Sequence, residues 1–116
     1  MFKRCFCGAE WKTREDFLTD KETALIGYQV NFEVLEEGYF LFLHARSGCK
    51  TTLGLETKAV LDLYDGPIYE ERKTGSAECP AYCLSKDNLM ACPARCACAH
   101  IREVIQIIKA WPKNPD

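Results

Sequence analysis

Apolar and polar residues alternate from Ala24 to Leu35, which is typical of a β-strand with one solvated face. The turn residues Glu36 to Gly38 follow, and Tyr39–His44 is then a nearly continuous apolar run of strand length. A second tight turn leads into a third short strand over Lys50–Leu55, rich in the threonine that strands accept. The pattern predicts a small antiparallel β-meander over residues 24–55, with Tyr39–His44 as its central strand.

Two later segments have apolar residues at helical spacing. Residues 56–64 predict a short helix lying on the sheet, because Asp65-Gly66-Pro67 then stops the pattern. A longer helix is predicted from Pro93 to Trp111, since proline is tolerated in the first turn and Pro112 cannot continue the helix. Its predicted core stripe consists of Ala94, Ala97, Cys98, Ile101, Val104, Ile105 and Ile108.

The predicted fold class is α+β. It comprises a small antiparallel β-meander packed with helices, plus a cysteine-rich C-terminal helical hairpin. The chain of 116 residues suits one domain, so we expect residues 1–116 to form a single cysteine-rich metal-binding domain. Within it, residues 1–20 form an N-terminal arm, with Thr13 and Asp16 as a helix-start signal, and residues 79–111 hold a cysteine clasp and the C-terminal helix.

Charge and composition exclude several classes of protein. The formal net charge is only −2 and the basic residues are dispersed, so we expect no nucleic-acid partner. No apolar run approaches the roughly 18 residues of a membrane span, and the N-terminus has no secretory pattern, so we expect a soluble, cytoplasmic protein without a membrane partner. In the reducing cytoplasm, eight cysteines indicate metal binding or redox chemistry.

The densest cysteine pattern lies between Cys79 and His100. It consists of two C-x3-C pairs, and residues four apart share a helix face, so both pairs can converge. The expected metal ligands are therefore Cys79, Cys83, Cys92 and Cys96, with His100 as a further candidate on the same helix face. In an oxidising compartment the same residues would instead form the disulfides Cys79–Cys96 and Cys83–Cys92.

A second, smaller candidate site joins the N-terminus to the meander. Cys5 and Cys7 lie two residues apart before Gly8, and this segment resembles half of a zinc knuckle with one spacer residue instead of the usual two to four. His44 and Cys49 bracket the turn between two predicted strands. Together these four residues make the three-cysteine, one-histidine set that is typical of structural zinc.

These patterns favour a non-enzymatic role. We expect a small domain that binds structural zinc and interacts with or regulates another protein, because full protein coordination leaves no position for a reactive water. The alternatives are an iron–sulfur protein or a thiol–disulfide redox protein, although C-x-x-C spacing is absent. Catalysis has only a speculative His44–Cys49 dyad to support it, and no glycine-rich phosphate loop occurs.

Overall fold

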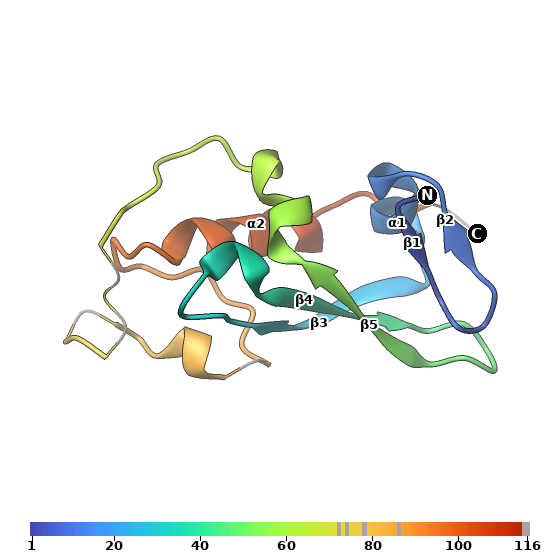
Figure 1. The fold of residues 1–116 in the computed structure, drawn as a ribbon, viewed down its shortest axis with the longest axis horizontal. Coiled ribbons are helices and arrows are strands. Elements are labelled where there is room, and N and C mark those ends of the chain that lie inside the picture. Colours follow the sequence, from blue (N-terminus) through green and yellow to red (C-terminus); the bar gives the residue numbers. More distant parts are fainter. Residues whose placement is uncertain (72, 74, 78, 86, 115–116) are drawn as a thin grey trace.

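A three-stranded antiparallel sheet forms the centre of the molecule in a computed structural model that describes residues 1–71, 73, 75–77, 79–85 and 87–114. The strands are β3 (Thr23–Gln29), β4 (Tyr39–His44) and β5 (Thr51–Glu56), and they follow one another in the order β3-β4-β5 (Figure 1). The antiparallel meander predicted from sequence is thereby confirmed, including the central position of the Tyr39–His44 strand. The fold is mixed α+β.

The N-terminal segment forms a second, two-stranded sheet followed by a short helix. Strands β1 (Lys3–Arg4) and β2 (Glu10–Trp11) pair antiparallel, and α1 (Arg14–Thr19) comes next. Thr13 caps α1, because its hydroxyl accepts a hydrogen bond of 3.1 Å from the amide of Asp16, as the sequence signal predicted. This β1–β2 hairpin lies at one end of the central sheet (Figure 1).

The core is built between the sheet and the C-terminal helix α2 (Ala99–Lys109), which runs along the sheet (Figure 1). Phe40 and Phe42 point into this core from β4, and each is 0% exposed. The members of the predicted stripe that lie on α2 are also buried, namely Ile101, Val104, Ile105 and Ile108. Each such side chain stabilises the fold by about 1.5–3 kcal/mol. No helix in the described part of the chain has the length and apolarity needed to cross a membrane.

The first predicted strand is shorter than expected, because it ends at Gln29 and not at Leu35. The side chain of Asn31 explains the difference, since its Oδ1 accepts hydrogen bonds of 3.0 Å from the amides of both Glu33 and Val34. An asparagine that bonds its own neighbouring backbone favours a turn over a strand.

The helix predicted over residues 56–64 is wrong. Strand β5 runs to Glu56, and two separate 3₁₀ turns follow, at Thr57–Ala59 and Leu61–Leu63. Thr57 is fully buried, and both its amide and its hydroxyl bond to distant carbonyls, those of Gly38 and Leu35. These tertiary bonds fix the start of the segment and override its helical periodicity.

The long helix from Pro93 is also wrong in its start. Helix α2 begins at Ala99, and the chain before it is irregular. The amide of Ala97 donates to the carbonyl of Glu71 at 2.8 Å, and the amide of Lys73 donates to the sulfur of Cys96 at 3.0 Å. Because these contacts to Glu71 and Lys73 compete with helical hydrogen bonding, the expected C-terminal helical hairpin is not found in the described residues, where residues 82–84 form only a 3₁₀ turn.

Candidate metal centre

A tight turn between β1 and β2 presents two cysteines from one short segment. The amide of Gly8 donates to the carbonyl of Cys5 at 3.0 Å, and the amide of Cys5 donates to that of Ala9 at 2.9 Å. Gly8 adopts φ +96°, a conformation that other residues rarely reach. The turn leaves Cys5 buried and Cys7 exposed at the surface.

Gly8→Ala is expected to destabilise the protein by about 1 kcal/mol and to weaken metal binding. An added Cβ at Gly8 would meet nothing within 4 Å, so the cost is backbone strain alone, and strain here displaces Cys7. Thermal unfolding with and without zinc measures both effects. Gly75→Ala is the matched control, because Gly75 also has a positive φ and open surroundings and should cost stability without changing zinc affinity. Equal zinc affinity in both variants would contradict this role for the turn.

The other two candidate ligands come from the connection between β4 and β5. His44 is the last residue of β4 and shares the inward face of Phe40 and Phe42, so it is only 1% exposed. Its ring packs edge-on against Trp11, with centroids 5.1 Å apart. Cys49 lies across the turn, where its amide donates to the carbonyl of Arg46 at 2.9 Å.

The two pairs converge. The sulfurs of Cys5 and Cys49 are 3.4 Å apart, and the sulfur of Cys7 is 3.6 Å from Nδ1 of His44. One ligand atom from each of Cys5, Cys7, His44 and Cys49 lies within 4.8 Å of the other three. Ligand atoms around one tetrahedral zinc lie about 3.5–3.8 Å apart, given Zn–S and Zn–N bonds of about 2.3 and 2.0 Å. The four side chains therefore form a possible metal-binding site.

The thiols of this site differ in their tendency to ionise. Burial raises the pKa of Cys5, whereas a hydrogen bond with the hydroxyl of Thr51 lowers the pKa of Cys49 to about 6. The Thr51 oxygen lies 3.2 Å from the Cys49 sulfur. The lowered pKa favours the thiolate of Cys49, which is the form that binds metal.

Two carboxylates that the sequence did not single out lie beside His44. Oxygens of Asp20 and Glu22 and a His44 ring nitrogen are all within 4.8 Å of one another. Asp20 is fixed in place, because its Oδ2 accepts from Trp11 Nε1 and its Oδ1 accepts from the amide of Glu22, each at 2.8 Å. Carboxylates near a metal-binding histidine orient its ring. In the sequence, the signal that could have pointed to these two carboxylates was their Asp-x-Glu spacing directly before β3.

A second group of sulfurs lies near the start of α2. The sulfur of Cys98 is 3.4 Å from that of Cys83 and 3.3 Å from that of Cys96, and all three residues are buried. The hydrogen bond between Cys83 and Cys98 lowers the pKa of Cys83 and raises that of Cys98. Cys98 was expected to be a core thiol apart from the clasp. It is buried, but because α2 begins after it, its sulfur faces the other cysteines.

Three candidate ligands of the Cys79–His100 segment remain, namely Cys79, Cys92 and His100. The sulfur of Cys79 accepts a hydrogen bond of 3.3 Å from the amide of Ala81. Cys92 is half-buried, and burial raises its pKa. His100 is the second residue of α2, where burial lowers its pKa and its Nδ1 has no hydrogen-bond partner among the described residues. Among the described residues, no group of three or more candidate ligand atoms within 4.8 Å of one another includes His100.

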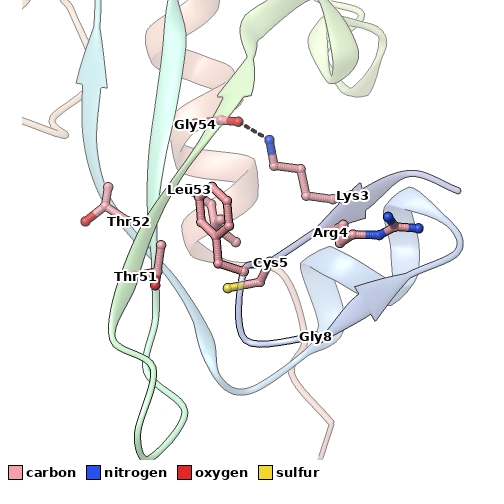
Figure 2. A pocket seen from close by; sticks show the side chains of 9 residues that line it. Lys3, Arg4, Cys5, Gly8, Thr51, Thr52, Leu53 and Gly54 are labelled. Carbon is pink, nitrogen blue, oxygen red and sulfur yellow. Dashed lines mark hydrogen bonds between the residues drawn. The ribbon is translucent and has the colours of Figure 1, made fainter.

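A pocket of about 530 Å³ opens between the β1–β2 hairpin and β5, beside the first site. Figure 2 shows Lys3 reaching across it to donate a hydrogen bond to the carbonyl of Gly54, with the sulfur of Cys5 near Leu53. Its lining consists of Lys3, Arg4, Cys5, Phe6, Gly8, Thr51, Thr52, Leu53 and Gly54. The hairpin is thus separated from β5 by a hollow that this lysine bridges.

Comparison of the chain with family models, curated proteins and solved structures gives no match. Function must therefore be inferred from the chemistry of these side chains.

Proposed function

We propose that the protein is a small zinc-binding domain in which Cys5, Cys7, His44 and Cys49 hold one structural zinc ion, and that it acts by binding another protein. One observation carries the metal site: four good ligands from two separate turns place their ligating atoms within 4.8 Å of one another. Three sulfurs and an imidazole suit zinc better than magnesium or calcium, which prefer oxygen. Four protein ligands make a closed site without a reactive water, which favours a structural role.

Iron–sulfur chemistry fits this site less well. The cysteine sulfurs of an iron–sulfur cluster bind several iron atoms, which are joined by bridging sulfides. Such sites usually consist of four thiolates. Here one donor is an imidazole and two sulfurs are only 3.4 Å apart, which suits a single ion. A redox role would require a disulfide such as Cys5–Cys49, which would leave Cys7 and His44 without a function.

Zinc would fix the position of the N-terminal hairpin. Cys5 and Cys7 belong to the hairpin, whereas His44 and Cys49 belong to the central sheet. A metal that binds all four connects segments about 40 residues apart in sequence and restricts the chain much as a disulfide does.

A protein partner is supported by the surface that this zinc would organise. Phe6 lies between the two knuckle cysteines and is 100% exposed, which is unusual for a large aromatic side chain. It borders the pocket next to β5. Aromatic side chains of this kind are enriched in protein–protein contacts. We therefore propose that the interaction surface is centred on Phe6, between Cys5 and Cys7.

Metal analysis of the full chain tests the proposal. Protein purified without oxygen and reloaded with cobalt is expected to show the absorption of a tetrahedral site with three thiolates and one imidazole. His44→Ala should remove this signal, while Lys50→Ala, in the adjacent loop but outside the ligand set, should retain it. If His44→Ala keeps the wild-type cobalt spectrum and stoichiometry, the proposed site is wrong.

A further inference from the structure

The outer edge of β5 has no neighbouring strand. The sheet order is β3-β4-β5 and the β1–β2 hairpin forms a sheet of its own, so within the described part of the chain β5 pairs with β4 alone. From the hairpin side, the amine of Lys3 donates to the carbonyl of Gly54 across the hollow (Figure 2). This carbonyl therefore points away from β4 and toward the hairpin.

The direction of the Gly54 carbonyl defines which backbone groups face this edge. In an antiparallel strand, the amide and carbonyl of one residue point to the same side, and the side alternates from residue to residue. The amides and carbonyls of Thr52, Gly54 and Glu56 thus face outward. Thr57 agrees with this alternation, because its amide donates to the carbonyl of Gly38, directly before β4. β5 therefore presents a row of backbone donors and acceptors that no other strand uses.

Two adjoining hollows follow this edge. The first is the pocket of about 530 Å³ described above, and the second has a volume of about 370 Å³ and is lined in part by Tyr39 and Glu56. Lys3 and Gly54 line both hollows, so together they form one groove along the six residues of β5, which span about 20 Å. An exposed aromatic side chain borders each hollow, Phe6 the first and Tyr39 the second.

The charges of the groove favour an acidic ligand. Among the charged side chains that line it, Arg4 pairs with Glu10 at 2.9 Å and Lys58 pairs with Glu56 at 3.0 Å. Lys3 has no carboxylate partner among the described residues, and a backbone carbonyl accepts only one of the hydrogens of its amine. The groove thus carries an uncompensated positive charge near its middle.

The opposite edge of the sheet is less suited to accept a strand. In β3 an extra residue, Ile26, shifts the register between Leu25 and Gly27. Irregularities of this kind bend an edge strand and protect it from further pairing. The register of β5 with β4 is unbroken over its whole length, and β5 contains no proline. β5 is therefore the edge to which an added strand can bond.

We propose that the groove along β5 binds an extended, acidic segment of a partner protein, which adds to the central sheet as a further strand. The backbone of the segment bonds to the outward groups of β5, and one of its carboxylates pairs with Lys3. A second copy of this chain fits less well, because two β5 edges side by side bring two Lys3 amines into one interface. The inference rests on the proposed role in binding another protein and specifies the conformation and charge of that partner.

Selection of peptides tests the groove. Random heptapeptides displayed on phage are selected on the zinc-loaded full chain under reducing conditions, and the most enriched peptide is synthesised for titration calorimetry. We expect it to be acidic and rich in β-forming residues, and to protect the amides of Thr52 and Gly54 from hydrogen exchange. Lys3→Met should weaken its binding about fivefold at low salt. Lys12→Met is the matched control, because Lys12 is exposed outside the groove, and should bind as wild type does.

A pair of substitutions at Glu56 tests the backbone contacts. Glu56 has φ −58°, which proline also adopts, and its amide faces the groove, so Glu56→Pro removes no hydrogen bond to β4. Glu56→Pro should weaken peptide binding about tenfold, because an interstrand hydrogen bond is lost. Glu56→Ala removes the same carboxylate but keeps the amide, so it should bind an acidic peptide at least as tightly as wild type.

Several results would overturn the inference. They are the absence of any enriched peptide, an enriched peptide without acidic residues, equal affinity of Glu56→Pro and Glu56→Ala, and a dimer of the free protein in native mass spectrometry that Glu56→Pro dissociates. If Glu56→Pro does not fold, as judged by circular dichroism, Lys3→Met against Lys12→Met decides, and equal affinity rejects the groove.

The cobalt spectrum keeps this test separate from the zinc site. Both Glu56 variants should retain the wild-type spectrum, because Glu56 lies outside the proposed ligand set. A chain that shows this spectrum but binds no peptide refutes the groove alone. A chain without the spectrum that still binds the peptide through β5 refutes the zinc site and leaves the groove in place.

Discussion

Cys49→Ser is expected to release one zinc ion per chain and to lower the free energy of unfolding by about 4 kcal/mol when free zinc is about a thousandfold above the dissociation constant. The serine hydroxyl does not ionise near neutral pH and cannot replace the thiolate. Without the metal, the β1–β2 hairpin loses its connection to the β4–β5 turn. Chemical denaturation in the presence of zinc, together with hydrogen exchange of residues 1–20, measures the loss.

The control for this variant is Cys79→Ser, which also removes one thiol but lies outside the proposed ligand set. It should retain wild-type zinc content and hairpin protection. A strong chelator added to reduced wild-type protein should reproduce the Cys49→Ser effect in the hairpin, while a reductant alone should leave the fold intact. Full zinc content in Cys49→Ser would remove Cys49 from the ligand set.

Arg102→Met is expected to cost about 3 kcal/mol of stability, because the Arg102 guanidinium holds the loop at residues 88–90 against α2. Nε donates to the carbonyl of Met90 at 3.0 Å, and Nη2 donates to the carbonyl of Asn88 at 2.7 Å. Hydrogen bonds from charged groups contribute about 1.5–3 kcal/mol each, and methionine recovers part of this total by removing a buried charge while filling similar space. Urea denaturation gives the value.

Arg95→Met is the matched control, since Arg95 is exposed and its replacement should change stability by less than about 0.5 kcal/mol. Hydrogen exchange should also show residues 88–90 opening more often in Arg102→Met. Equal stability of the two variants would mean that desolvation of the guanidinium cancels its hydrogen bonds.

The sheet and the first site were accessible from sequence because their determinants are local. Alternation fixes which face of a strand is buried, and Tyr39–His44 is confirmed residue for residue. His44 and Cys49 face each other across one turn, and Cys5 and Cys7 share another. That the two pairs meet depends on how the hairpin docks against the sheet. From the sequence, this could be inferred only because the two pairs together make a set of four ligands.

The group of sulfurs of Cys83, Cys96 and Cys98 was harder to predict from the sequence, because its geometry depends on distant backbone contacts. The hydrogen bond between Lys73 and Cys96 joins residues 23 positions apart, and no periodicity encodes it. It keeps residues before Ala99 out of the helix and turns Cys98 toward Cys83. Arg102 was missed for a related reason, since a charged residue beside an apolar helix stripe is normally exposed.

The molecule is elongated, with extents of 44 × 25 × 23 Å, and the β1–β2 hairpin and the start of α2 lie toward opposite ends of its long axis (Figure 1). Charges this far apart are screened at physiological salt, where the Debye length is about 8 Å. Perturbations that share no partner and are more than about 10 Å apart usually add. The destabilisation of the double variant Cys49→Ser/Arg102→Met should therefore equal the sum of the two single values, so a change at one end of the protein leaves the stability of the other end unaltered.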